Sequence, residues 1–129
     1  MSEPLKTIAV PGAPKAIGPY AQGIVAGGFL FTAGQVPLDP ATGKLLSGTV
    51  AEETDRVFDN LEAILAGAGC GFPDVAKATV FLTDLGDFAE MNGVFAARFG
   101  SHRPARSTVQ VGRLPAGARI EIELVAKIP

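Results

Sequence analysis

The feature that most constrains this chain is a change of hydrophobic period along its second half. In residues 49–68, apolar side chains recur at the spacing of one helix face. Thr49 and Glu52 form a capping-box pattern at the start of this segment, and glycines at 67, 69 and 71 mark its end. Residues 74–83 then alternate as a half-buried strand does, with an apolar face made of Ala76, Ala78, Val80 and Leu82.

A second helix is predicted after this strand. It begins at Asp87, has Glu90 three residues further on, and ends at Gly100. Its buried stripe is predicted to be Phe88, Met91, Phe95 and Phe99.

Short strands complete the pattern. They are predicted at residues 6–10, in the hairpin 23–35 around Gly27-Gly28, and at residues 107–111 and 119–127. The order β-β-β-α-β-α-β-β, in a single domain over residues 1–129, is typical of an α+β fold with two helices on one face of a sheet. The other face would carry Phe31, Phe81 and Val125, which predicts that a partner subunit covers it.

Composition limits the classes of partner. The 11 basic and 13 acidic residues leave a net charge of −2, with no basic excess to neutralise phosphates, so nucleic acid is not expected to bind. The chain starts without the apolar core of a signal peptide, and no stretch is long enough to span a bilayer. The single cysteine suits a reducing compartment, so a cytoplasmic location is expected.

The residue pattern gives little support for a metal site or for a nucleophilic side chain. The one histidine and one cysteine form no ligand cluster at a recognised spacing, so no metal is predicted. Cys70 is expected to be a small buried thiol at a helix end, and His102 a solvated residue after the second helix, rather than a nucleophilic pair.

Arg106 is the most informative polar residue, because it begins a strand that is otherwise predicted to be core. Such an arginine needs an anionic partner, and its planar group matches a carboxylate through two hydrogen bonds. The partner is either a structural salt bridge or a bound ligand. Glu121 and Glu123 are either a solvated or salt-bridged face or a source of a general base. Tyr20 is either a packing aromatic or a hydroxyl donor to a ligand.

Whether a residue number is odd or even indicates the face of a strand to which its side chain points, and this gives one indication of where the site lies. If residues 107–111 and 119–127 form a regular antiparallel hairpin, with residue 111 opposite residue 119, even and odd positions lie on different faces. Arg106 and Glu121 would then point to opposite faces of the sheet. They could serve one site only through a bulge or across a subunit interface, which favours an intersubunit site.

Several separated motifs resemble the RidA/YjgF family, in the same order and over essentially the whole chain. The resemblance implies a mixed sheet with two helices, similar to the Bacillus-type chorismate mutase, assembled as a homotrimer with its sites in clefts between subunits. The motifs are residues 16–23 (AIGPYAQG), 32–37 (TAGQVP), 87–92 (DFAEMN), 104–107 (PARS), 114–115 (LP) and 120–123 (IEIE).

The resemblance also implies roles for single residues. Arg106 matches the arginine that binds the substrate carboxylate, and Glu121 matches the acid that positions water. Ala33 and Thr108 are substrate-site positions where active members often have serine and cysteine, so the substrate range stays open. The other residues that match the cleft are Tyr20, Gly34 and Asn92.

The activity that the resemblance implies is hydrolysis of 2-imino and enamine acids, such as 2-iminobutanoate and 2-iminopropanoate, to 2-keto acids and ammonia. Pyridoxal-phosphate dehydratases acting on serine and threonine release such compounds. Because an imine is already reactive in water, positioning suffices and no cofactor is expected. The alternatives are a non-catalytic, small-molecule-binding or chaperone-like trimer, and an RNA-directed ribonuclease or translation inhibitor, which the net charge disfavours.

Overall fold

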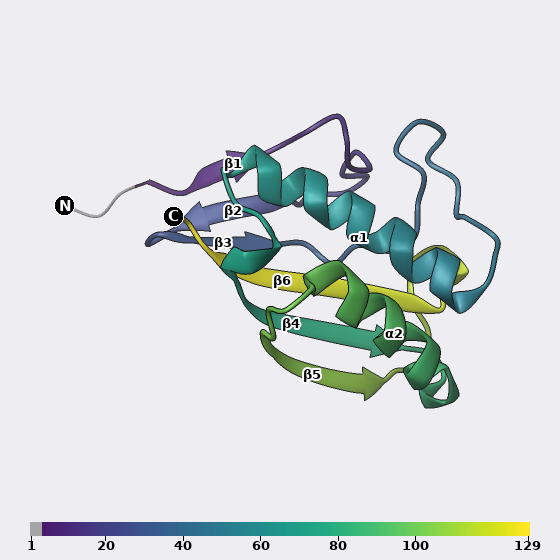
Figure 1. Ribbon diagram of the computed structural model, residues 1–129. Coiled ribbons are helices and arrows are strands. Elements are labelled where there is room, and N and C mark those ends of the chain that lie inside the picture. The colour runs from purple at the N-terminus through teal and green to yellow at the C-terminus, as the bar shows by residue number, and fades with distance from the viewer. Residues whose placement is uncertain (1–3) are drawn as a thin grey trace.

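A six-stranded sheet with both helices on one face forms the structure, a computed structural model that describes residues 4–129 (Figure 1). The predicted α+β class and the predicted order of elements are confirmed. In chain order the elements are β1 (Lys6–Ile8), β2 (Gly23–Ala26), β3 (Phe29–Thr32), α1 (Val50–Gly67), β4 (Val75–Leu82), α2 (Phe88–Phe99), β5 (Ala105–Gln110) and β6 (Ile120–Lys127).

The sheet is mixed, with the strand order β1-β2-β3-β6-β4-β5. β4 and β5 are parallel and are joined through α2, whereas the other neighbouring strands are antiparallel. The last strand, β6, therefore lies in the middle of the sheet, between β3 and β4. Both of its edges are paired and its inner face is covered by the helices, which buries Ile120, Ile122, Leu124 and Ala126.

The hairpin between residues 107–111 and 119–127 that the parity argument supposed is not formed. β5 is an edge strand that pairs with β4, and Arg106 lies opposite Ala78 in that pairing. The connection from β5 to β6 contains the short turn Pro115–Gly117, with φ of 60° at Ala116 and 74° at Gly117. A connection of this length lets β6 reach past β4, where it finds hydrogen-bonding partners on both edges.

Two side chains predicted on the core face lie elsewhere. A register shift at the start of β4 leaves Ala76 exposed, and the buried positions of that strand continue from Ala78. Phe88, at the start of α2, is 36% exposed because it lies at the open side of the helix, next to the Arg106 side chain. By contrast, the Gly27-Gly28 turn has the predicted positive φ at both residues, 59° and 83°.

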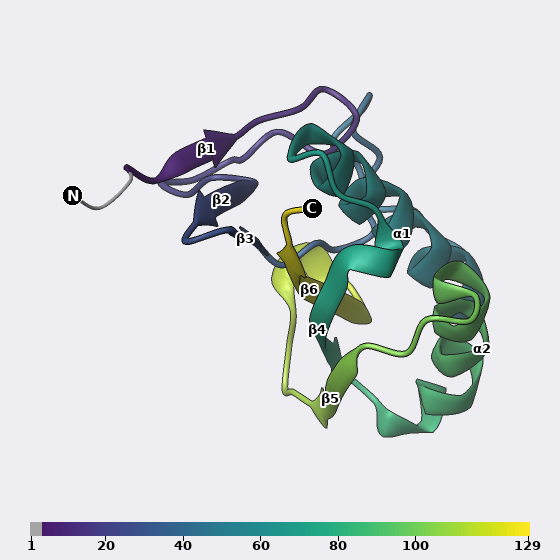
Figure 2. The same ribbon diagram turned by 60° about the vertical axis from the view of Figure 1, so that its left-hand side comes forward.

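The core lies between the sheet and the two helices, which sit on the same side of the sheet (Figure 2). Phe58 of α1 is fully buried, and its ring meets those of Phe72, Phe95 and Phe99 edge to face at centroid distances of 5.7–5.9 Å. Edge-to-face pairs of this kind add to the stabilisation from apolar burial. The aromatic cluster therefore fixes α2 against α1. Neither helix of the described chain is long and apolar enough to cross a membrane.

The start of α1 carries the predicted capping box. Thr49 Oγ1 accepts a hydrogen bond from Glu52 N at 3.1 Å, and the Glu52 carboxylate accepts one from Thr49 N at 2.9 Å. The Glu90 side chain of α2 caps the other helix. Its carboxylate accepts a hydrogen bond from the backbone N–H of Ala51, at the start of α1, at 2.8 Å. Both helices thus help to satisfy the free N–H groups at this end.

Thr49→Ala is expected to lower the free energy of unfolding by about 1 kcal/mol, because Glu52 N loses its acceptor. Thr49→Ser keeps the hydroxyl and is expected to stay close to the wild type. Urea denaturation followed by circular dichroism measures both. Equal losses in the two variants would contradict a capping role for the hydroxyl.

Candidate functional site

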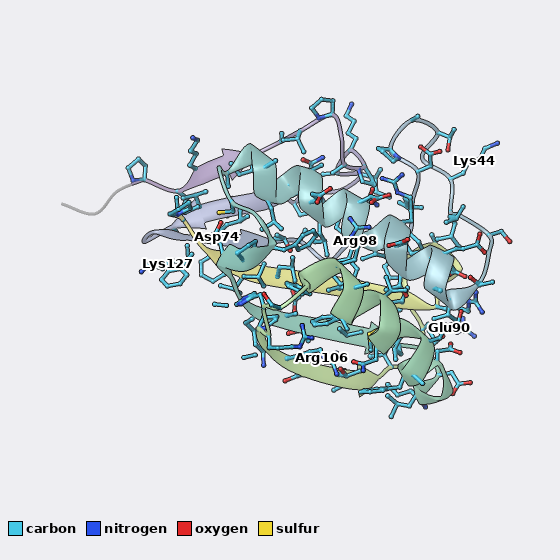
Figure 3. All side chains as sticks on the ribbon, viewed as in Figure 1. Lys44, Asp74, Glu90, Arg98, Arg106 and Lys127 are labelled. Atoms are coloured by element: carbon cyan, nitrogen blue, oxygen red, sulfur yellow. The ribbon has the colours of Figure 1, made fainter. Side chains whose placement is uncertain are left out.

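Arg106 extends from β5 toward α2, on the face of the sheet that the helices cover (Figure 3). Its Nη1 donates a hydrogen bond to Asn92 Oδ1 at 2.7 Å. The guanidinium carbon lies 4.7 Å from the ring centroid of Phe95 and 5.3 Å from that of Phe88. Within residues 4–129 no carboxylate forms a salt bridge with it. A structural salt bridge, one of the two alternatives left open by the sequence, is therefore not found in this part of the chain.

The Arg106 guanidinium borders an open pocket of about 380 Å³. Arg103 also lines this pocket, but it donates hydrogen bonds to the Gly100 and His102 carbonyls at the end of α2. Both of these bonds come from Arg103 Nη1, so within residues 4–129 Arg103 and Arg106 each keep Nε and Nη2 without a protein partner, and Arg106 is the one that lies against the rings of Phe88 and Phe95. The pocket is lined by Asn92, Phe95, Ala96, Arg103, Pro104 and Arg106.

Glu121 lies on the opposite face of the sheet. In the pairing of β6 with β4 it is opposite Phe81, an outward position. Its carboxylate lies against Gly34, where an added Cβ would be only 1.8 Å from Glu121 Oε2. Glycine at residue 34 therefore leaves the room that the carboxylate occupies. The next residue, Gln35, exchanges two backbone hydrogen bonds with Ile122, at 2.9 and 3.1 Å, and holds this segment beside β6.

The electrostatic surroundings of Glu121 disfavour its charged form. Burial raises the pKa of Glu121 above the ordinary glutamate value, and the negative charge of Glu123 on the same face raises it further. A carboxyl group with a raised pKa is better matched to proton exchange near neutral pH. The sheet therefore separates the Arg106 guanidinium on one face from the Glu121 carboxyl, which is suited to proton exchange, on the other.

Tyr20 lies apart from both groups. It is exposed on the loop before β2, and its hydroxyl oxygen accepts a long hydrogen bond from Ile17 N at 3.5 Å. It borders a hollow formed mainly by residues 7–22, and neither Arg106 nor Glu121 lines that hollow. Within one chain, Tyr20 is thus not assembled with the other predicted site residues.

The two positions that depart from the family pattern have different surroundings. Ala33 N donates a hydrogen bond to Gln22 O at 2.9 Å, which ties its backbone to the segment that follows Tyr20. Thr108 lies opposite Val80 in β5, on the same face as Arg106. Its buried hydroxyl finds no hydrogen-bond partner within the described residues.

Two residues that help to position the candidate site residues were not predicted from the sequence. Gln22 Oε1 accepts a hydrogen bond from Val10 N at 2.7 Å, and its Nε2 donates to carbonyls of the same loop, so it fixes the segment that carries Tyr20. Phe95 was assigned to the core alone, although it also lies against Arg106. The helical spacing from Asn92 to Phe95 was the available signal, because residues three apart share a face.

His102 and Cys70 have structural surroundings. His102 is half-buried, with Nε2 2.7 Å from Val75 O, so its prediction as a solvated residue is wrong. Cys70 is half-buried, and burial raises the pKa of its thiol, with a smaller contribution from Asp74. A raised pKa lowers the thiolate fraction, which disfavours a nucleophilic role. Across residues 4–129 no group of three or more His, Cys, Asp or Glu side chains is placed to hold a metal ion.

Arg106 and Glu121 do face opposite sides of the sheet, as parity indicated, although the pairing behind that argument was wrong. In the pairing of β5 with β4, Arg106 lies opposite the buried Ala78. In the pairing of β6 with β4, Glu121 lies opposite the outward-facing Phe81. Asn92 and Thr108 lie on the side of Arg106. The sheet thus divides the predicted site residues of one chain into separate groups.

The fold and this site define a class of small α+β protein in which an arginine without a carboxylate partner in residues 4–129 borders an open pocket. Residues 10–128 match the family described as Endoribonuclease L-PSP, and the chain belongs to this family, the RidA/YjgF family. A RutC family protein from Pyrococcus horikoshii is 53% identical over 114 residues, 88% of this chain and 90% of that protein. A human protein named 2-iminobutanoate/2-iminopropanoate deaminase is 45% identical over 121 residues, 94% of this chain and 88% of that protein.

A solved structure agrees with this assignment. The crystal structure of E. coli TdcF with bound serine has a TM-score of 0.88 to this chain, with 42% sequence identity. The similarity covers 95% of this chain and 98% of that one. It supports the mixed sheet and the two helices as features of the family fold.

The side-chain carboxyl of Glu121 is expected to titrate above the ordinary glutamate value in carbon-detected NMR. Glu123→Gln should lower the midpoint by removing a negative charge, without restoring the ordinary value, because burial is the larger cause. Glu52 provides an internal reference, since hydrogen bonds from Thr49 lower its pKa. A Glu121 midpoint at or below that of Glu52, or one unchanged in the variant, would contradict this account.

Proposed function

We propose that this protein hydrolyses 2-imino acids and their enamine tautomers, such as 2-iminobutanoate and 2-iminopropanoate, to 2-keto acids and ammonia. The observation that carries the proposal is the Arg106 guanidinium, which borders an open pocket and has no carboxylate partner within residues 4–129. Its planar group is suited to the carboxylate of a small acid. The name of the human relative and the serine bound to TdcF point to the same class of ligand.

In the proposed reaction Arg106 holds the substrate carboxylate and orients the adjacent C=N carbon. A water held by Glu121 attacks this carbon, and the carboxylate takes a proton from the water and passes it to the nitrogen. The tetrahedral intermediate carries a hydroxyl and an amino group. The carboxylate moves the hydroxyl proton to the amino nitrogen as the C–N bond breaks, so that ammonia leaves and the water oxygen remains as the ketone. The raised pKa of Glu121 favours this double proton transfer.

The proposal requires two copies of the chain, because Arg106 and Glu121 lie on opposite faces of one sheet. Large apolar side chains on the outer face support association, since Phe29, Phe31 and Val109 are all exposed. Such a face is typical of a surface that a partner covers. In a cyclic homotrimer the outer face of one subunit would meet the β5 edge of the next, giving sites completed between subunits, with residues such as Gly34, Asn92 and Tyr20 near the ligand.

Arg106→Ala is expected to lower kcat/KM by about 30- to 1000-fold, because the substrate carboxylate loses a charged hydrogen-bond partner. The assay generates 2-iminobutanoate with a threonine dehydratase and follows its capture by semicarbazide, which the wild type should suppress. Arg113→Ala is the matched control, since Arg113 lines a different pocket, with Thr83 and Arg119. Wild-type protein that binds keto acid without suppressing the adduct would favour a non-catalytic binder instead.

Mixing two impaired variants tests whether the site is shared. Arg106→Ala and Glu121→Gln are each expected to lose most of the wild-type activity alone. Co-expressed and assembled together, they should regain activity, because some interfaces then combine an intact Arg106 with an intact Glu121 from the neighbour. Sedimentation should show that each variant has the oligomeric state of the wild type. If mixed assemblies form and stay inactive, the site does not lie between chains as proposed.

A further inference from the structure

Three side chains of α2 surround the Arg106 guanidinium. Phe88, Asn92 and Phe95 are spaced four and three residues apart, so they share one face of the helix. The two rings lie 5.3 and 4.7 Å from the guanidinium carbon, and Asn92 Oδ1 accepts a hydrogen bond from Nη1. A cation over the face of an aromatic ring is attracted by the negative charge of that face. The helix therefore holds the guanidinium in one orientation.

This arrangement leaves one edge of the guanidinium for a ligand. Nη1 is engaged by Asn92, whereas Nε and Nη2 have no hydrogen-bond partner within residues 4–129. An Nε–Nη2 edge presents two parallel donors at the spacing of a carboxylate. The contacts with the two rings restrict rotation of the guanidinium plane.

We infer that Phe95 is a positioning residue, whose ring face keeps the free Nε–Nη2 edge of Arg106 turned toward the pocket for the acid group of the ligand. The inference rests on the proposed function, in which Arg106 holds the substrate carboxylate. Phe95 is the nearer of the two rings and is only 5% exposed, so its attraction to the guanidinium is weakly screened. Phe88 assists from the exposed side.

The ring of Phe95 is itself fixed by the core. Phe58 of α1 holds it in an edge-to-face contact, with the ring centroids 5.7 Å apart. The orientation of the arginine is therefore determined by the packing of α1 against α2. Without the ring, Arg106 samples several rotamers, and each binding event has to order a long flexible side chain, which weakens binding by about three- to tenfold.

Phe95→Leu and Phe99→Leu form a matched pair. Both residues lie on α2 in the same aromatic cluster and are 5% and 4% exposed, but Phe95 is the one whose ring lies under Arg106. Both variants should lose a similar amount of thermal stability. Phe95→Leu should raise KM for the imino acid about three- to tenfold, with kcat within about twofold of the wild type. Phe99→Leu should leave both constants within about twofold.

A binding measurement separates this inference from the proposed function. Calorimetry with 2-oxobutanoate needs no turnover, and its Kd should rise about three- to tenfold in Phe95→Leu and stay within about twofold in Phe99→Leu. If the wild type binds this keto acid but hydrolyses no imine, the proposed function fails while the Kd ratio still decides the inference. Equal Kd changes in the two variants overturn it.

Site-specific fluorination covers the case in which Phe95→Leu does not fold. Replacing Phe95 by 4-fluoro- and 3,4,5-trifluorophenylalanine keeps the ring shape but progressively weakens the negative charge of its face. The Kd for 2-oxobutanoate should rise with the number of fluorine atoms at residue 95, and not when the same residues are placed at 99. A flat response at residue 95 overturns the inference.

Discussion

The packing of α2 against α1 is the interaction on which the candidate site depends. Phe58 is fully buried between the two helices, and its ring contacts those of Phe95 and Phe99. This contact sets which face of α2 turns toward β5, and that face carries Asn92 and the inner side of Phe95. Arg106 is consequently held by a helix whose orientation is fixed by apolar burial, so a polar function follows from the geometry of the core.

The sheet imposes the second constraint, because it places Arg106 and Glu121 on different sides. Glu121 stands on the outer face of β6, in the room that Gly34 leaves open, and its surroundings raise its pKa. Neither group can reach the other through a packed sheet. A site that uses both therefore has to be completed by another copy of the chain, which links the proposed chemistry directly to assembly.

Local signals were predicted well and long-range pairing was not. The capping box at Thr49 and the positive φ at Gly27-Gly28 depend on neighbours within a few residues, and both were found as expected. The supposed hairpin of residues 107–111 and 119–127 was wrong, because adjacency in sequence does not decide whether β6 inserts between β3 and β4. Ala76 and Phe88 were misplaced for related reasons, one by a register shift and one by its position at the open side of a helix.

The sequence alone determined the class of fold, the helix limits and the candidate residues Arg106, Glu121 and Gly34, since periodicity, capping and motif spacing are properties of short segments. Only the tertiary structure decided that no carboxylate within residues 4–129 pairs with Arg106, and that the rings of α2 hold it. The physical reason is that both facts depend on contacts between segments that lie far apart in the chain. Such contacts form only when burial of the core brings the segments together.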